Sequence, residues 1–137
     1  LPQLVELGVT QQVIATMRSF PEEEGVAAAG CYLVALLASQ GATHHDLLRG
    51  AGASEAVVAA MRASPRSLYV SVVGCEAIGR LASEWWYIRD LVAVEAAEVV
   101  LATLKADFGA DARYGRLAQA ACFAIYHLGE NSQPAQE

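Results

Sequence analysis

This sequence repeats itself with a period of 43 to 47 residues. Residues 8–38 align with residues 52–82 without a gap, and 11 of the 31 columns are identical, which is several-fold more than chance would give. A weaker third copy aligns residues 100–106 and 121–129 with the same pattern and carries about four extra residues in its loop, 107–115. A period of this length indicates a stack of similar units, each burying its apolar side against its neighbours.

Each unit is predicted to contain two main helices and no strand. Val13, Ile14 and Met17 form a short apolar stripe that ends near Pro21, because proline lacks the N–H that the next turn of a helix needs. A longer helix is expected from about Glu22, with acidic residues in its first turn. Its apolar stripe recurs in all three units, as Val26, Gly30, Leu33, Val34 and Leu37; Val70, Gly74, Ala77, Ile78 and Leu81; and Leu117, Ala121, Ala124, Ile125 and Leu128.

A shorter helical stretch precedes each pair of helices, at 43–50 and 83–92, with a remnant at 1–8. The glycine on each apolar stripe, at positions 30 and 74, predicts that the shorter main helix crosses closely there. The predicted units are 1–40, 41–83 and 84–129, which together form one domain of residues 1–129, followed by a polar tail at 130–137 that we expect to fray.

Three helices per unit at this period resemble the armadillo repeat, over residues 1 to about 129. That family has an aliphatic residue in the first helix, a glycine before the second and a leucine at the end of the third. The matching residues are Leu4, Leu48 and Leu91; Gly8 and Gly52, from which Glu95 departs; and Leu37, Leu81 and Leu128. The resemblance implies an all-α fold, a right-handed α-solenoid of about three armadillo-like three-helix repeats. HEAT repeats, with two helices per unit, are the near alternative, and the glycines favour the armadillo pattern.

One flank of each long helix carries small residues. They are Ala27, Cys31, Ala35 and Ala38; Ser71, Cys75, Gly79 and Ala82; and Ala118, Cys122, Tyr126 and Gly129, of which only Tyr126 is large. Small side chains allow the helix of a neighbouring unit to approach, so we expect this flank to be the stacking surface. Equivalent cysteines on helices about 8–10 Å apart are too distant for a disulfide, so the thiols are expected to stay reduced.

The remaining face of the long helices differs from unit to unit, and we call six of its residues the variable face. These residues are Tyr32, Leu36, Glu76, Arg80, Phe123 and His127. The armadillo resemblance implies that such a face lines a concave groove that binds an extended peptide or a partner helix. Nuclear-import adaptors of that family carry Trp and Asn ladders there, whereas this chain has a single asparagine, Asn131, in the tail. The mixture of aromatic, acidic and basic groups predicts an amphipathic helix or a mixed-charge peptide as the partner.

No catalytic, cofactor or metal site is predicted. His44 and His45 are adjacent and would point about 100° apart on a helix, which does not suit one metal ion. His127 is expected to be a solvent-exposed histidine. No nucleophile-elbow, zinc-protease or phosphate-loop motif is present, and the cysteines lie on an apolar flank without a basic neighbour.

Trp85, Trp86 and Tyr87 are three consecutive aromatic residues, which point in different directions from one helix. We expect one or two of them to fill the seam between the second and third units. A remaining exposed ring, Trp85 or Trp86, is a candidate aromatic anchor for a protein partner.

Charge and hydropathy limit the partners further. The formal net charge of −6 and the scattered Lys and Arg residues argue against nucleic-acid binding. The longest uncharged apolar run, Gly25–Ala38, has 14 residues, which is short for a membrane span and predicts a buried helix. The sequence begins at Leu1 without a methionine, so targeting is not judged, and an intracellular, cytoplasmic location is only the default.

The function predicted from the sequence is therefore a non-catalytic protein–protein interaction module or scaffold. It would bind a partner peptide or helix on the concave face of its third helices. The alternative is a structural subunit of a large multi-protein assembly, held by the ends and edges of the solenoid. Terminal repeats normally carry polar caps, and the first unit here lacks most of its opening helix.

Overall fold

The computed structural model describes residues 8–106, 108 and 113–131, and within these residues the fold is helical, without a strand. The helices are α2 (Val9–Ser19), α3 (Glu24–Ala38), α4 (Ala42–Ala51), α5 (Ala53–Ala63), α6 (Leu68–Ala82), the 3-10 helix η1 (Trp85–Tyr87), α7 (Ile88–Ala93), α8 (Ala96–Lys105) and α9 (Tyr114–Asn131). The all-α class is thus confirmed. The predictions for Leu4, for most of the loop at 107–112 and for the end of the tail lie outside the described residues.

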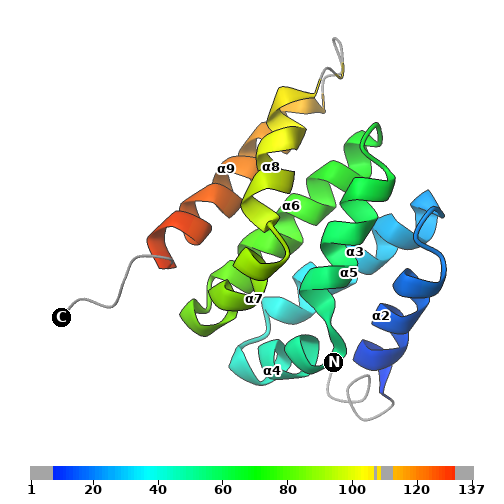
Figure 1. The fold of residues 1–137 in the computed structure, drawn as a ribbon, viewed down its shortest axis with the longest axis vertical. Coiled ribbons are helices and arrows are strands. Elements are labelled where there is room, and N and C mark those ends of the chain that lie inside the picture. The colour runs from blue at the N-terminus through cyan, green and yellow to red at the C-terminus, as the bar shows by residue number, and fades with distance from the viewer. Residues whose placement is uncertain (1–7, 107, 109–112, 132–137) are drawn as a thin grey trace.

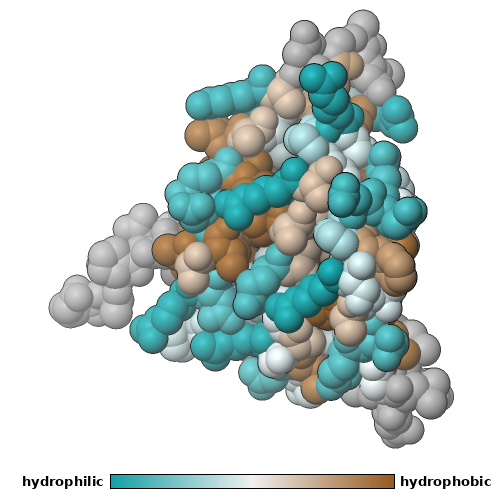
Figure 2. All heavy atoms as spheres, turned by 45° about the vertical axis from the view of Figure 1, so that its right-hand side comes forward, coloured by the Kyte–Doolittle hydropathy of each residue, from teal (hydrophilic) through white to brown (hydrophobic). Residues whose placement is uncertain are grey.

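The three long helices α3, α6 and α9 lie next to one another, with α6 packed between the other two. Each of the shorter helices α2, α5 and α8 packs against the long helix that follows it in the chain. Figure 1 shows the chain progressing from α2 on the right to α8 and α9 on the left, with α4 and α7 toward the lower end. Seen from an oblique side, the surface alternates apolar patches with hydrophilic side chains (Figure 2).

The helices α2, α5 and α8 each begin directly after a residue in the left-handed backbone region. These residues are Gly8 (φ 73°), Gly52 (φ 81°) and Glu95 (φ 60°). Glycine adopts this conformation readily, whereas a residue with a Cβ is strained by roughly 1–2 kcal/mol. Glu95 therefore keeps the left-handed backbone conformation of the two glycines, although it is not a glycine itself.

The glycines of the apolar stripes mark close helix crossings, as the sequence predicts. A Cβ added at Gly74 would lie 2.5 Å from Cγ of Met61, which is closer than side chains approach one another. A Cβ at Gly30 would overlap the side chain of Met17 in the same way. The first two units therefore make the same packing contact, Gly30 with Met17 and Gly74 with Met61.

Two helix boundaries differ from the predictions. The long helix expected from Glu22 begins at Glu24, because Glu23 is extended (φ −84°, ψ 104°) and its N–H bonds to Phe20 O at 3.2 Å, closing a turn. Only Glu24 of the three acidic residues lies in the first helical turn. The stretch predicted at 83–92 is not one helix but the 3-10 turn η1 followed by α7.

The predicted apolar stripes lie in the core, except that Val26 and Leu33 on α3 are only partly buried and Ile125 on α9 is exposed. Ile78 and Val34 are at most 1% exposed, whereas Ile125 at the matching position of α9 is 41% exposed. The small-residue flank behaves likewise, since Cys31 and Cys75 are fully buried and Cys122 is exposed. The expectation that Ile125 belongs to the core and Cys122 to a stacked flank is wrong, because no described helix packs beyond α9.

Candidate partner-binding face

The variable face is contributed by three neighbouring helices, two residues from each. Tyr32 and Leu36 lie on α3, one turn apart, and are 57% and 40% exposed. Glu76 and Arg80 follow on α6, and Phe123 and His127 on α9. Because α6 packs between α3 and α9, these matching positions follow one another across the long helices, and we call this row of residues the strip.

On the α6–α9 side, the strip is held together by direct contacts. Arg80 Cζ lies 5.3 Å from the centroid of the Phe123 ring, a cation–π arrangement worth about 0.5–1 kcal/mol at an exposed site. The ring of Phe123 packs onto Gly79, where an added Cβ would overlap it. The absence of a side chain at Gly79 is therefore what lets Phe123 lie flat between α6 and α9.

His127 is less exposed than predicted. Its side chain is 21% exposed, and its ring makes edge contacts with Phe123 and Tyr126, at centroid distances of 4.6 and 5.1 Å. Its Nδ1 lies 3.9 Å from a carboxylate oxygen of Glu130. The expected solvent-exposed histidine is thus part of an aromatic cluster, since the two neighbouring rings on the same helix cover it.

Two residues of the same strip escaped the sequence prediction. Tyr69 is seven positions before Glu76 on α6 and is 50% exposed. Arg116 is seven positions before Phe123 on α9, and its Nη2 lies 4.0 Å from a carboxylate oxygen of Glu76. Seven residues are two helical turns, so continuing the face by one more heptad would have found both.

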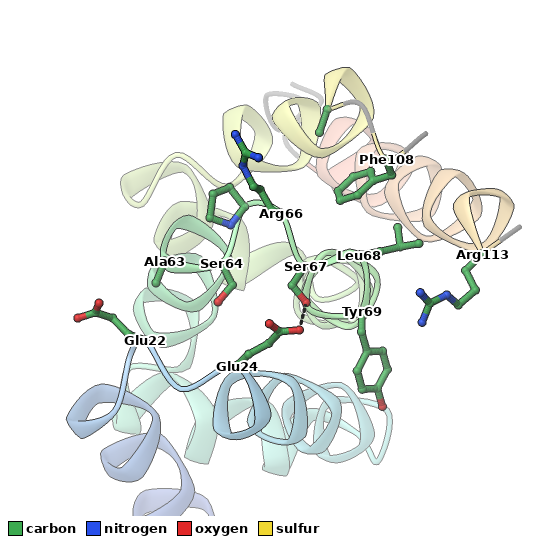
Figure 3. Close-up of a pocket in the computed structure, with 12 residues that line it drawn as sticks. Glu22, Glu24, Ala63, Ser64, Arg66, Ser67, Leu68, Tyr69, Phe108 and Arg113 are labelled. Carbon is green, nitrogen blue, oxygen red and sulfur yellow. Dashed lines mark hydrogen bonds between the residues drawn. The ribbon is translucent and has the colours of Figure 1, made fainter. Parts of the chain in front are cut away.

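Beyond Tyr69 the surface hollows into a polar cleft of about 1150 Å³ at the N-terminal ends of α3 and α6 (Figure 3). Ser67 Oγ donates a hydrogen bond of 2.7 Å to Glu24 Oε2, so the two side chains point toward each other across the cleft. Ser67 Oγ also accepts from the backbone N–H of Val70 at 3.1 Å and caps α6. Arg66 and Arg113 line the same cleft. Its polar walls lie next to Tyr69 of the strip.

The three consecutive aromatics have different surroundings. Trp85 is 71% exposed, Trp86 is half-buried and Tyr87 is fully buried. The rings of Trp86 and Tyr87 pack against His45, at centroid distances of 5.9 and 6.1 Å. Of the two candidate anchors, Trp85 is therefore the ring that is available to a partner, while Trp86 takes part in an internal cluster.

His45 is buried and bridges two helices through its ring nitrogens. Nδ1 lies 3.1 Å from Gly41 O and Nε2 lies 3.0 Å from Arg80 O, in the last turn of α6. A carbonyl oxygen only accepts, so the ring donates to one of them when neutral and to both when protonated. The ring thus lies between the start of α4 and the end of α6. Among the described residues no group of three His, Cys, Asp or Glu side chains is placed to hold a metal ion.

The two buried cysteines, Cys31 and Cys75, have raised thiol pKa values. Burial raises the pKa of the Cys31 thiol to about 12, with a smaller contribution from the nearby Cys75. Burial also raises the pKa of Cys75 to about 11, although its contact with Thr103 Oγ1 at 3.6 Å acts in the opposite direction. A thiol that is protonated at neutral pH is a poor nucleophile, so neither sulfur is equipped for covalent catalysis.

Comparisons with known proteins do not identify this fold or this face, since no protein-family model, curated protein or solved structure matches the chain. Within the part of the chain that the structure describes, no helix combines the length and hydrophobicity needed to cross a bilayer.

Proposed function

We propose that this chain is a non-catalytic protein-binding module, built as a right-handed armadillo-like solenoid of about three units. The repeated backbone features support the repeat architecture: three left-handed residues one unit apart, two matching Met–Gly crossings, and long helices packed in chain order. The variable face, extended by Tyr69 and Arg116, is the surface proposed to bind the partner.

The observation that carries this proposal is the exposure of Tyr32 and Leu36. The cation–π pair of Arg80 and Phe123 lies on the two long helices that follow α3. A tyrosine and a leucine one turn apart on α3 offer adjacent apolar contact area that the fold itself does not cover. Aromatic and arginine side chains are the residues that most often dominate the binding energy of protein interfaces. Such a combination on one strip favours recognition of another protein over a solvent-facing role.

The side chains of the strip indicate which kind of partner would fit it. The α3 side is apolar, while the α6–α9 side carries the guanidinium groups of Arg80 and Arg116 with Glu76 between them. An amphipathic helix fits this pattern, because its apolar stripe can cover Tyr32 and Leu36 while acidic residues on its flank approach Arg80. The backbone of an extended peptide has no asparagine ladder to bind here, so we favour the helix.

The proposal is tested with two charge variants, Leu36→Glu and Arg80→Glu, used as bait in quantitative pull-downs from native extract. Both side chains are exposed, so the fold is expected to tolerate the changes. Partners bound through the variable face should be depleted at least about tenfold by either variant. Leu101→Glu, at a residue that is 45% exposed on α8, is the matched control and should retain them. Equal recovery with all three variants would refute the assignment of the face.

The alternative function, a structural subunit held through its ends, is favoured by a separate observation. Leu101, Ile125 and Tyr126 are exposed at the α8–α9 end. An apolar cleft of about 370 Å³ lies at the same end, between Leu91, Ile125 and Leu128.

A further inference from the structure

The α8–α9 end exposes positions that are buried in the two preceding units. Leu101 aligns with Ile14 and Val58 in the sequence repeat, which are 1% and 2% exposed, yet Leu101 is 45% exposed. Ile14 lies on α2 and Val58 on α5, and each of these helices has a following unit packed beyond it. The side chain at this position is therefore one that a following unit normally covers.

The long helix α9 shows the same change along its flank. Cys122 aligns with Cys31 and Cys75, which are both fully buried, but Cys122 is exposed. Ile125 aligns with the buried Val34 and Ile78 and is 41% exposed. The surface that α3 presents to α6, and α6 to α9, is thus repeated on α9 without a described helix against it.

The opposite end presents the complementary surface. Ala29 of α3 is exposed, while Val73, its match in α6, is 1% exposed. An apolar cleft of about 290 Å³ surrounds Ala29. Its other main apolar members, Val13, Val26 and Leu33, are only partly buried, whereas their matches Val57, Val70 and Ala77 are fully buried. The second unit, unlike the first, has a preceding unit packed against its α5 and α6.

From these two surfaces we propose that the α8–α9 end of one copy binds the α2–α3 end of a second copy, head to tail. The contact continues the interfaces α3–α6 and α6–α9 that already exist within the chain, and both halves of it are exposed on the same molecule. The inference rests on the repeat alignment of the proposed function, but it uses a different surface from the variable face. A head-to-tail contact leaves one free end on each side of the assembly, so it adds copies one after another unless their rotation closes a ring.

Polar contacts between units extend the same register. Arg18 Nη2 donates to Gly52 O at 3.3 Å, and Arg62, one unit later, bonds to Glu95 at 3.1 Å. Lys105 is the next residue in this series and is exposed. In the head-to-tail contact its ammonium group would face the carbonyl of Gly8 in the second copy, since Gly8 aligns with Gly52 and Glu95.

Tyr126 makes the proposed contact looser than the internal ones. It stands where the preceding long helices have Ala35 and Gly79, and it is 60% exposed with its hydroxyl donating to Glu130 Oε2 at 2.8 Å. The exposed ring has to turn aside before a second copy can pack as closely on α9 as α9 packs on α6, and this lowers the affinity. We therefore expect association that is reversible and concentration-dependent.

The test uses one variant for each end, Ile125→Glu and Ala29→Glu, both at exposed positions, followed by analytical ultracentrifugation over a concentration series. The unmodified chain should form a series of oligomers, and each variant alone should associate at least about tenfold more weakly. A mixture of the two variants keeps one intact end on each partner, so it should form a dimer and nothing larger. A monomeric unmodified chain, or dimers of either variant alone at the original strength, would overturn the proposal.

A disulfide test fixes the register independently. Thr16 aligns with Thr103, whose Oγ1 lies 3.6 Å from Cys75 Sγ, and Cys122 aligns with Cys75. In a Thr16→Cys variant, Cys122 of one copy should therefore form a disulfide with position 16 of the next under mild oxidation, giving a ladder in non-reducing electrophoresis. Adding Cys122→Ser should abolish the ladder. A ladder that survives this change, or the absence of a ladder in the Thr16→Cys variant, would contradict the head-to-tail register. Partner binding at the variable face would not be affected, because Leu36→Glu tests it separately.

Discussion

Arg62 and Glu95 join two successive units through an ion pair, with Nη2 of the arginine 3.1 Å from Oε1 of the glutamate. Glu95 is also the one described residue other than glycine with a positive φ, at 60°. Arg18 occupies the matching place one unit earlier, where it donates to the backbone carbonyl of Gly52 and lies 3.8 Å from a carboxylate oxygen of Glu55. Glu95 thus offers a side-chain carboxylate to the arginine of the preceding unit, whereas Gly52 offers its backbone carbonyl oxygen.

Glu95→Gly is expected to stabilise the fold by about 0.5–1 kcal/mol. Removing the Cβ relieves a left-handed strain of roughly 1–2 kcal/mol, which outweighs an exposed ion pair worth about 0–1 kcal/mol and the added freedom of the unfolded chain. Chemical denaturation measures the change. Glu98→Gly, in the helical part of α8, is the control and should destabilise by about 1 kcal/mol. If both glycines destabilised equally, Glu95 would not be strained.

Gly74→Ala is expected to destabilise the protein by about 1–2 kcal/mol. The new methyl group would lie 2.5 Å from Cγ of Met61, and the cost of overpacking exceeds the helix propensity gained. Gly25→Ala is the matched change, because no atom lies within 4 Å of its Cβ position on α3. We expect a neutral or slightly stabilising effect there. Similar free energies of unfolding for the two variants would contradict this prediction, because they would show that the Met61 side chain moves aside without loss of stability.

The stability of the fold is predicted to fall above about pH 9 because of Cys31 and Cys75. Burial raises the pKa of these thiols to about 12 and about 11, from 9.0. A raised pKa contributes stability that is fully present below the unfolded value and is lost as the pH rises toward the folded one. The loss should be roughly 2 kcal/mol per thiol by about pH 10.5.

The measurement is the free energy of unfolding against pH for the unmodified chain and for a Cys31→Ala, Cys75→Ala variant. The variant starts from a lower stability, so the slopes are compared. A flatter curve for the variant above about pH 9 agrees with the prediction, whereas parallel curves would contradict it.

The helical class and the close crossings could be predicted from the sequence because they depend on short-range patterns. Apolar spacing identifies a helix wherever it packs, and a glycine aligned with a methionine contact recurs with the repeat. The start of α3 at Glu24 was missed because a backbone turn between Phe20 and Glu23 delays the helix. Propensity alone does not report such a turn.

Long-range relationships were the part that the sequence did not reveal. The exposure of Ile125 depends on what packs beyond α9 and not on the residue itself, which matches two buried positions. The partner of His45 is the carbonyl of Arg80, which is 35 residues away and has no sequence signature. The variable face was found only in part, since Tyr69 and Arg116 lie two helical turns before the predicted residues, although the helical period could have found both.

The central claim, that the variable face binds a protein partner, is tested most directly by photo-cross-linking. A benzophenone amino acid replaces Tyr32 on this face or Phe20 off it, two aromatic residues that are 57% and 54% exposed. In native extract, position 32 should cross-link to discrete proteins that position 20 does not reach, and Arg80→Glu in the same chain should suppress them. Identical products from both positions, or products at position 32 that are unaffected by Arg80→Glu, would contradict the claim.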